Sequence, residues 1–208
     1  MRKGWLAPLL LTGVLLALAF GLVALEPLFH QLFPAQERAM YRQQGFAELL
    51  GAHLALVLIS SGIALVVALA AGIWVTRSSG RAYRSLVESL VSMGQTFPPV
   101  AVLALAVPLI GFGEQPAYIA LAIYGLLPML QGVIAGLEAI PQSAVDAARG
   151  LGLRPWQIFR SVEWPLAAPI ALAGLRTSVT INIGTAAIAA TVGSQNLGSP
   201  IILSLIHI

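Results

Sequence analysis

Long apolar runs alternate with short polar segments along this chain of 208 residues. A transmembrane helix needs about 20 mostly apolar residues, and four runs reach that length: residues 5–25, 49–76, 117–137 and 165–192. A shorter run, residues 98–111, predicts a fifth span, whose prolines are tolerated if neighbouring helices satisfy the freed carbonyl groups. The pattern therefore predicts an all-α polytopic membrane helix bundle.

Basic residues in the polar segments predict how the bundle is oriented. Of the lysine and arginine residues, Arg38 and Arg42 lie between the first two spans, and Arg176 falls inside the last one. By the positive-inside rule, the N-terminus and the polar insert near residues 141–165 are cytoplasmic. The other eight basic residues share that side: Arg2, Lys3, Arg77, Arg81, Arg84, Arg149, Arg154 and Arg160.

Composition agrees with a membrane protein. Only 9% of the residues are charged and 58% are hydrophobic, whereas about 25% are charged in an ordinary soluble domain. The net charge of +3 comes from basic residues spread in twos and threes, so we expect no nucleic-acid partner. The first apolar run also fits a signal peptide, but its length and the spans that follow favour a retained helix.

The polar insert predicts two short helices. The first, "PQSAVDAARGLG", begins near Pro141, and either Gly150 or Gly152 can supply its left-handed cap. The second, "PWQIFRSVEW", begins at Pro155 and is expected to end at Pro165. Its apolar stripe of Trp156, Phe159 and Val162 suits either a knob that docks on another protein or an amphipathic hairpin lying on anionic lipid; the spacing alone favours neither.

The insert resembles the EAA loop of transmembrane subunits of binding-protein-dependent ABC importers. The resemblance rests on Asp146-Ala147-Ala148, the following Gly152 and the stretch "PWQIFRSVEWPLAAP". Asp146 stands where the family usually has Glu, and Trp164-Pro165 where it often has Leu-Pro. The resemblance implies a coupling helix that seats in a cleft of a separate ATPase, with these coupling residues: Asp146, Ala147, Ala148, Gly152, Trp156, Phe159 and Pro165.

Two further stretches, residues 95–130 and 172–201, resemble permeases of osmoprotectant importers, which carry glycine betaine, carnitine or choline. The resemblance implies a permease in the bacterial cytoplasmic membrane, partnered by ATPase subunits, an external solute-binding protein and a second copy or a homologous permease. One alternative is the same kind of permease for another solute such as methionine. Another is a secondary carrier or channel that needs no ATPase.

The chain offers no candidate catalytic residues, no metal-binding motif and no phosphate-binding G-x-x-x-x-G-K-[ST] loop. We therefore expect no cofactor, and ATP hydrolysis on another chain. Within the fifth span, Arg176, Thr180 and Asn182 predict a translocation path, because intramembrane polar groups tend to face a bundle interior or an aqueous route. The alternative role for such hydroxyl and amide groups is hydrogen bonding between helices.

The predicted domains are residues 1–48, a span with an external loop; residues 49–202, the importer domain with its insert at 141–165; and residues 203–208. These last six residues, "LSLIHI", can be encoded by CTG TCT CTT ATA CAC ATC, which resembles a transposon end used as a sequencing adapter. We hypothesise that they are adapter read-through, and that a sixth span is missing.

Overall fold

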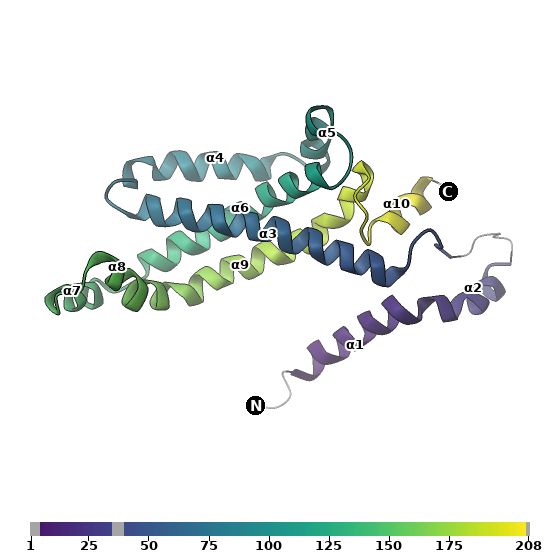
Figure 1. The fold of residues 1–208 in the computed structure, drawn as a ribbon, viewed down its shortest axis with the longest axis horizontal. Helices are drawn as coiled ribbons and strands as arrows, with labels where there is room; N and C mark the ends of the chain where they lie inside the picture. Colours follow the sequence, from purple (N-terminus) through teal and green to yellow (C-terminus); the bar gives the residue numbers. More distant parts are fainter. Residues whose placement is uncertain (1–4, 35–39, 207–208) are drawn as a thin grey trace.

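The computed structural model describes residues 5–34 and 40–206 (Figure 1). Arg2, Lys3, Arg38 and residues 207–208 lie outside the described residues. The described chain is helical: α1 Leu6–Gly21, η2 Leu22–Leu25, α2 Glu26–Leu32, α3 Phe46–Thr76, η3 Arg81–Tyr83, α4 Arg84–Thr96, α5 Pro99–Ile110, α6 Glu114–Glu138, α7 Gln142–Gly150, α8 Pro155–Ile158, η4 Phe159–Glu163, α9 Trp164–Ala186, η5 Ala187–Val192 and α10 Ser199–Ile206.

Four helices are long and apolar enough to cross a membrane, at Leu6–Leu32, Phe46–Thr76, Glu114–Glu138 and Pro155–Val192. They coincide with the four long runs of the sequence, and the predicted all-α fold is confirmed. The fifth span differs from its prediction. Residues 98–111 form the short helix α5, which is joined to α4 at a bend of 94°.

Helix α4 was missed because serines, Arg84 and Glu88 lower its hydropathy. It nevertheless packs along α6, where Gly94 fits against Ile123 and Gln95 donates a hydrogen bond of 2.7 Å to the carbonyl of Tyr124. The chain bends between α4 and α5 at Pro98 and Pro99, which cannot donate backbone hydrogen bonds to the preceding turn. At about 1.5 Å per residue, the 12 residues of α5 are too short to cross a membrane without α4.

Helix α6 lies at the centre of the bundle and makes its most extensive contact with α9. Glycines allow that approach: a Cβ on Gly132 would lie 2.9 Å from the Cα of Gly174, and one on Gly136 would lie 2.6 Å from the Ala167 carbonyl oxygen. Small residues let helix backbones meet closely in membranes. Gly132 and Gly136 therefore pack against α9 of the same chain.

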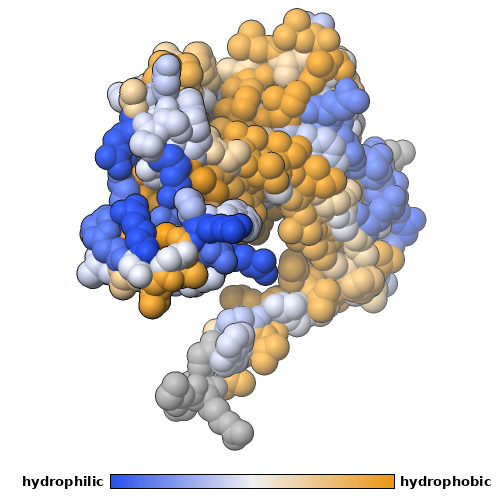
Figure 2. Space-filling model, turned by 60° about the vertical axis from the view of Figure 1, so that its left-hand side comes forward, coloured by the Kyte–Doolittle hydropathy of each residue, from blue (hydrophilic) through white to orange (hydrophobic). Residues whose placement is uncertain are grey.

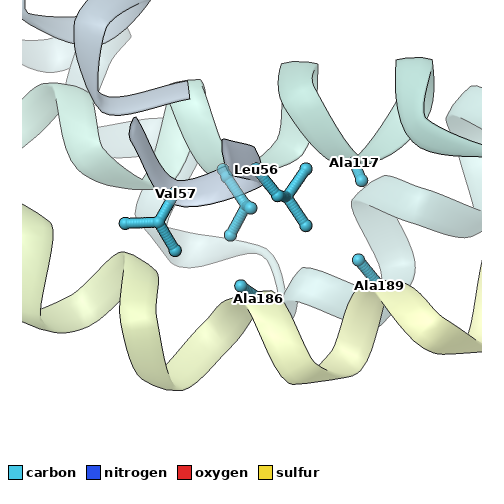
Figure 3. Close-up of a cluster of buried hydrophobic side chains, with 6 residues drawn as sticks. Leu56, Val57, Ala117, Ala186 and Ala189 are labelled. Atoms are coloured by element: carbon cyan, nitrogen blue, oxygen red, sulfur yellow. The ribbon is translucent and has the colours of Figure 1, made fainter. Parts of the chain in front are cut away.

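On its other side α6 packs against α3 through buried aliphatic side chains. Leu56 and Val57 of α3 meet Ala117 of α6 and Ala186 at the end of α9, close to Ala189 (Figure 3). His53 belongs to the same interface: it is 4% exposed, and its Nε2 lies 3.1 Å from the carbonyl oxygen of Ile183. The His53 ring is therefore packed between α3 and α9.

Helix α1 lies at the edge of this core, where it touches α3. It runs in the opposite direction to α3 (Figure 1), and none of its residues, all of which are described, is buried. Its leucine-rich surface is therefore open to lipid or to another protein.

Candidate coupling site and translocation path

Helices α7 and α8 gather at one end of the bundle, next to the last turn of α3 and the start of α9 (Figure 1). Val145, Ala148 and Ile158 form a small buried cluster there. Leu153 packs against it from the turn between the two helices. The insert thus has a core of its own, which fixes α7 against the base of α9.

Gly152 provides the left-handed turn that ends α7. Its φ is +77°, its N–H donates to the Arg149 carbonyl at 2.9 Å, and the N–H of Leu153 donates to the Ala148 carbonyl at 3.2 Å. These two bonds form a Schellman cap, in which Leu153 supplies the accompanying apolar contact. Gly150, the other glycine that the sequence offered for this cap, is instead the last residue of α7.

The predicted coupling residues divide between the surface and the interior of the insert. Asp146, Ala147, Gly152 and Pro165 are exposed, as is Trp156, at 66%. Phe159 is half-buried, with its ring stacked on that of Trp156 at 5.5 Å, and Ala148 is buried. Leu151, which the sequence analysis did not single out, is 82% exposed. Asp146, Leu151 and Trp156 are thus exposed on the surface of the insert.

The expected end of the second helix at Pro165 is wrong. Residues Phe159–Glu163 form a π-helical turn, in which the N–H of Trp164 donates to the carbonyl of Phe159. The wider π turn accommodates the proline ring, which would otherwise crowd the preceding turn. The helix therefore continues over Pro155–Val192, and the second half of the insert, from Pro155, is the start of this span.

An ion pair ties this π turn to the end of α3. The Arg77 guanidinium donates two hydrogen bonds to the Glu163 carboxylate, at 3.0 and 2.5 Å, and lies 5.5 Å from the Phe159 ring centroid. Hydrogen bonding to Glu163 raises the pKa of Arg77 above its usual value. The sequence carried no signal for this pair, whose members are 86 residues apart.

The three residues predicted to line the path do not share one environment. Arg176 and Thr180 are exposed one turn apart on α9. Asn182 is fully buried, and its Nδ2 donates a 3.0 Å hydrogen bond to Ser61 Oγ on α3. Asn182 therefore joins two helices of the same chain, as the alternative reading of such residues expects.

The sequence analysis did not single out other polar groups that are exposed on the long helices. On α4, hydroxyl side chains recur at spacings of four, three and four along one exposed line, and Gln131 of α6 is exposed as well. This period matches one face of an α-helix. The segment was not predicted as a membrane helix because its hydropathy is low. The hydroxyl line consists of Ser85, Ser89, Ser92 and Thr96.

A helical membrane bundle with a small folded knob continuous with one span is suited to be moved by a protein that binds the knob. In agreement, residues 68–207 match the family of binding-protein-dependent transport system inner membrane components. The chain belongs to this family, and it is a multi-pass inner-membrane permease subunit.

Two curated relatives narrow the comparison. The chain is 41% identical over 146 residues to the osmoprotectant import permease protein OsmY of Salmonella typhimurium, covering 70% of this chain and 62% of the relative. It is 37% identical over 155 residues to the glycine betaine/carnitine/choline transport system permease protein OpuCB of Bacillus subtilis, covering 74% and 70%. The match thus spans less than two thirds of the Salmonella relative.

Solved structures share the fold. An inward-facing structure of the MetNI methionine ABC transporter matches with a TM-score of 0.64 at 25% identity, over 74% of this chain and 76% of that one. An amino acid ABC transporter crystallised with histidines matches with a TM-score of 0.61 at 20% identity, over 78% and 79%.

Proposed function

We propose that this chain is the permease of an ATP-driven importer for quaternary-amine osmoprotectants such as glycine betaine, carnitine or choline. The observation that carries the proposal is the 41% identity with a permease named for osmoprotectant import. The methionine transporter is 25% identical, which supports the shared architecture more than a shared solute.

In this proposal the insert at 141–165 docks on a cytoplasmic ATPase through the exposed side chains of Asp146, Leu151 and Trp156. Movement of the knob passes directly into α9, because the helix is continuous through Pro165. It passes into α3 as well, through Arg77 and Glu163. A docked ATPase would then shift two spans together.

The translocation path is proposed to form where a second permease copy or a homologous permease covers the polar faces. Arg176 and Thr180 on α9, Gln131 on α6 and the hydroxyl line on α4 are exposed within the described chain. Such groups are costly in contact with lipid and usually face a bundle interior or water. A facing subunit would enclose them.

Quaternary ammonium groups are commonly held by several aromatic faces. Only 7% of the residues are aromatic, so tight capture is assigned to a separate external binding protein and weak passage to the permease. In the proposed orientation the insert and the N-terminus are cytoplasmic, which the antiparallel course of α1 and α3 supports.

The test is uptake of labelled glycine betaine by cells that express the chain with its ATPase and its binding protein. Excess carnitine or choline should block uptake, and excess methionine should not. An ATPase with its phosphate-binding lysine replaced should abolish uptake. Blockage by excess methionine would instead indicate a permease for methionine. Uptake with the inactive ATPase would indicate a secondary carrier.

A further inference from the structure

A cavity of about 350 Å³ opens beside the coupling insert, between the turn after α3, the end of α6 and α7. Its lining contains three arginines and only one carboxylate. Its polar and charged lining includes Arg77, Ser78, Arg81, Gln142, Arg149 and Glu163. Asp146, Leu151 and Trp156, the side chains proposed to meet the ATPase, do not line the cavity, although Asp146 pairs with Arg149 at its edge.

The carboxylate in this cavity is already engaged. Glu163 accepts both hydrogen bonds from Arg77, so that pair is close to neutral. Arg149 lies 3.3 Å from Asp146 in an exposed pair on α7, and water screens such pairs strongly. Arg81 forms no ion pair within the described part of the chain. The cavity therefore has an excess of positive charge at Arg81 and Arg149.

The turn that carries Arg81 is held in place by its neighbours. The rings of Trp74 and Tyr83 stack across it at 5.5 Å and 17°. Gly80 lies so close to Trp74 that a Cβ there would be 2.2 Å from the carbonyl oxygen. The N–H of Arg81 donates to the Arg77 carbonyl at 3.0 Å. These contacts fix the backbone of Arg81 before any ligand binds, which lowers the entropy cost of ordering the turn.

The cavity lies at the ends of two membrane helices, where lipid headgroups are expected. Thr76 ends α3, Leu137 belongs to the last turn of α6, and both contribute to the lining. The indole of Trp74, 44% exposed, lies next to the same turn, as is usual for tryptophan at a membrane interface. Figure 2 shows hydrophilic residues gathered at this end of the molecule beside a broad apolar surface.

We propose that this cavity binds a phosphate group, with Arg81 and Arg149 as its main ligands. The group comes either from the headgroup of an anionic phospholipid of the inner leaflet or from free phosphate. Guanidinium groups bind phosphate oxygens by charge-assisted hydrogen bonds, and basic pockets at the cytoplasmic ends of membrane helices commonly bind lipid headgroups. A bound phosphate would link the turn after α3 to α7 and brace the coupling insert.

The test uses the full chain purified in detergent. Native mass spectrometry measures retained phosphatidylglycerol against phosphatidylcholine, and calorimetry measures binding of inorganic phosphate. Arg81→Gln should weaken binding by about fivefold, the effect of one arginine near a lipid surface. Arg149→Gln should do the same. Arg160→Gln is the matched control, because it removes the same charge from an exposed position outside the cavity.

Selective loss of phosphatidylglycerol in the two cavity variants identifies a lipid headgroup. Loss of inorganic phosphate binding in those variants, with no preference between the two lipids, identifies free phosphate. Equal behaviour of Arg81→Gln, Arg149→Gln and Arg160→Gln in both assays overturns the proposal. A thermal unfolding curve for each variant separates lost binding from lost folding, and the two cavity variants lie on different elements, so one can be assessed if the other fails to fold.

Discussion

Arg77 and Glu163 meet through two hydrogen bonds between the end of α3 and the π turn at the start of the last long span. The Glu163 side chain is 12% exposed and that of Arg77 is 41% exposed. The pair lies between the insert and the membrane helices, where it joins two spans that are far apart in the sequence.

Removing the charge of Glu163 should therefore weaken both the fold and the coupling. We expect Glu163→Gln to lower the free energy of unfolding by about 1–2 kcal/mol, less than for a fully buried pair because Arg77 is partly exposed. ATP hydrolysis by the assembled transporter should also drive less uptake. Arg160→Gln, on the same π turn, is the control; equal effects of the two variants would contradict a role for the ion pair.

Gly152 should be sensitive to any side chain. Its φ of +77° lies in the left-handed region, which costs about 1–2 kcal/mol for most residues and less for asparagine. We expect Gly152→Leu to uncouple uptake from ATP hydrolysis and Gly152→Asn to do so less. Both rates are measured in the same vesicles.

Gly150→Ala is the matched change two residues earlier. A Cβ there meets nothing within 4 Å, and a helical Gly→Ala change is neutral or stabilising by up to about 1 kcal/mol. If Gly150→Ala impaired coupling as much as Gly152→Leu, the left-handed cap would not be the reason for the effect.

The contact between α6 and α9 should not tolerate a larger residue at Gly174. A Cβ at this position would lie 2.4 Å from the carbonyl oxygen of Pro128. Backbone cannot retract as a flexible side chain does, so we expect Gly174→Val to lower stability by about 1–3 kcal/mol or more. Thermal unfolding in detergent measures the loss. Gly184→Val on the same helix, where nothing lies within 4 Å, should unfold near the wild-type temperature.

Replacing Asn182 should change the stability of the chain, whereas replacing Thr180 should change the rate of transport. Asn182→Ala removes the hydrogen bond to Ser61 and should destabilise the chain by about 0.5–1 kcal/mol, with a less than additive effect when combined with Ser61→Ala. Thr180→Ala should leave unfolding within about 0.5 kcal/mol of wild type but change the uptake rate. A destabilised Thr180→Ala with normal transport would argue against a path along this face.

Hydropathy was sufficient to predict the long spans, because a bilayer requires an uninterrupted apolar segment. It failed at α4, whose outward face carries serines that a second subunit or water can accommodate. The glycine and proline pattern also predicted short helices after the span that ends at Glu138, and α7 and α8 lie there.

The internal geometry of the insert was less accessible. A proline normally ends a helix, and the register that carries the chain through Pro165 depends on how the π turn packs. The choice between Gly150 and Gly152 depended on the contact of Leu153 with the insert core. Partners such as Arg77 for Glu163 and Ser61 for Asn182 are set by helix packing, which a single sequence does not reveal.

The position of α9 after the other core helices has a consequence for the order in which the bundle assembles during synthesis. The most extensive interface of the described chain joins α6 to α9, which ends at Ala186. Helices α3 and α6 are made before α9, so they must wait in the membrane with the faces that will contact α9 uncovered. The bundle closes only once α9 has been translated.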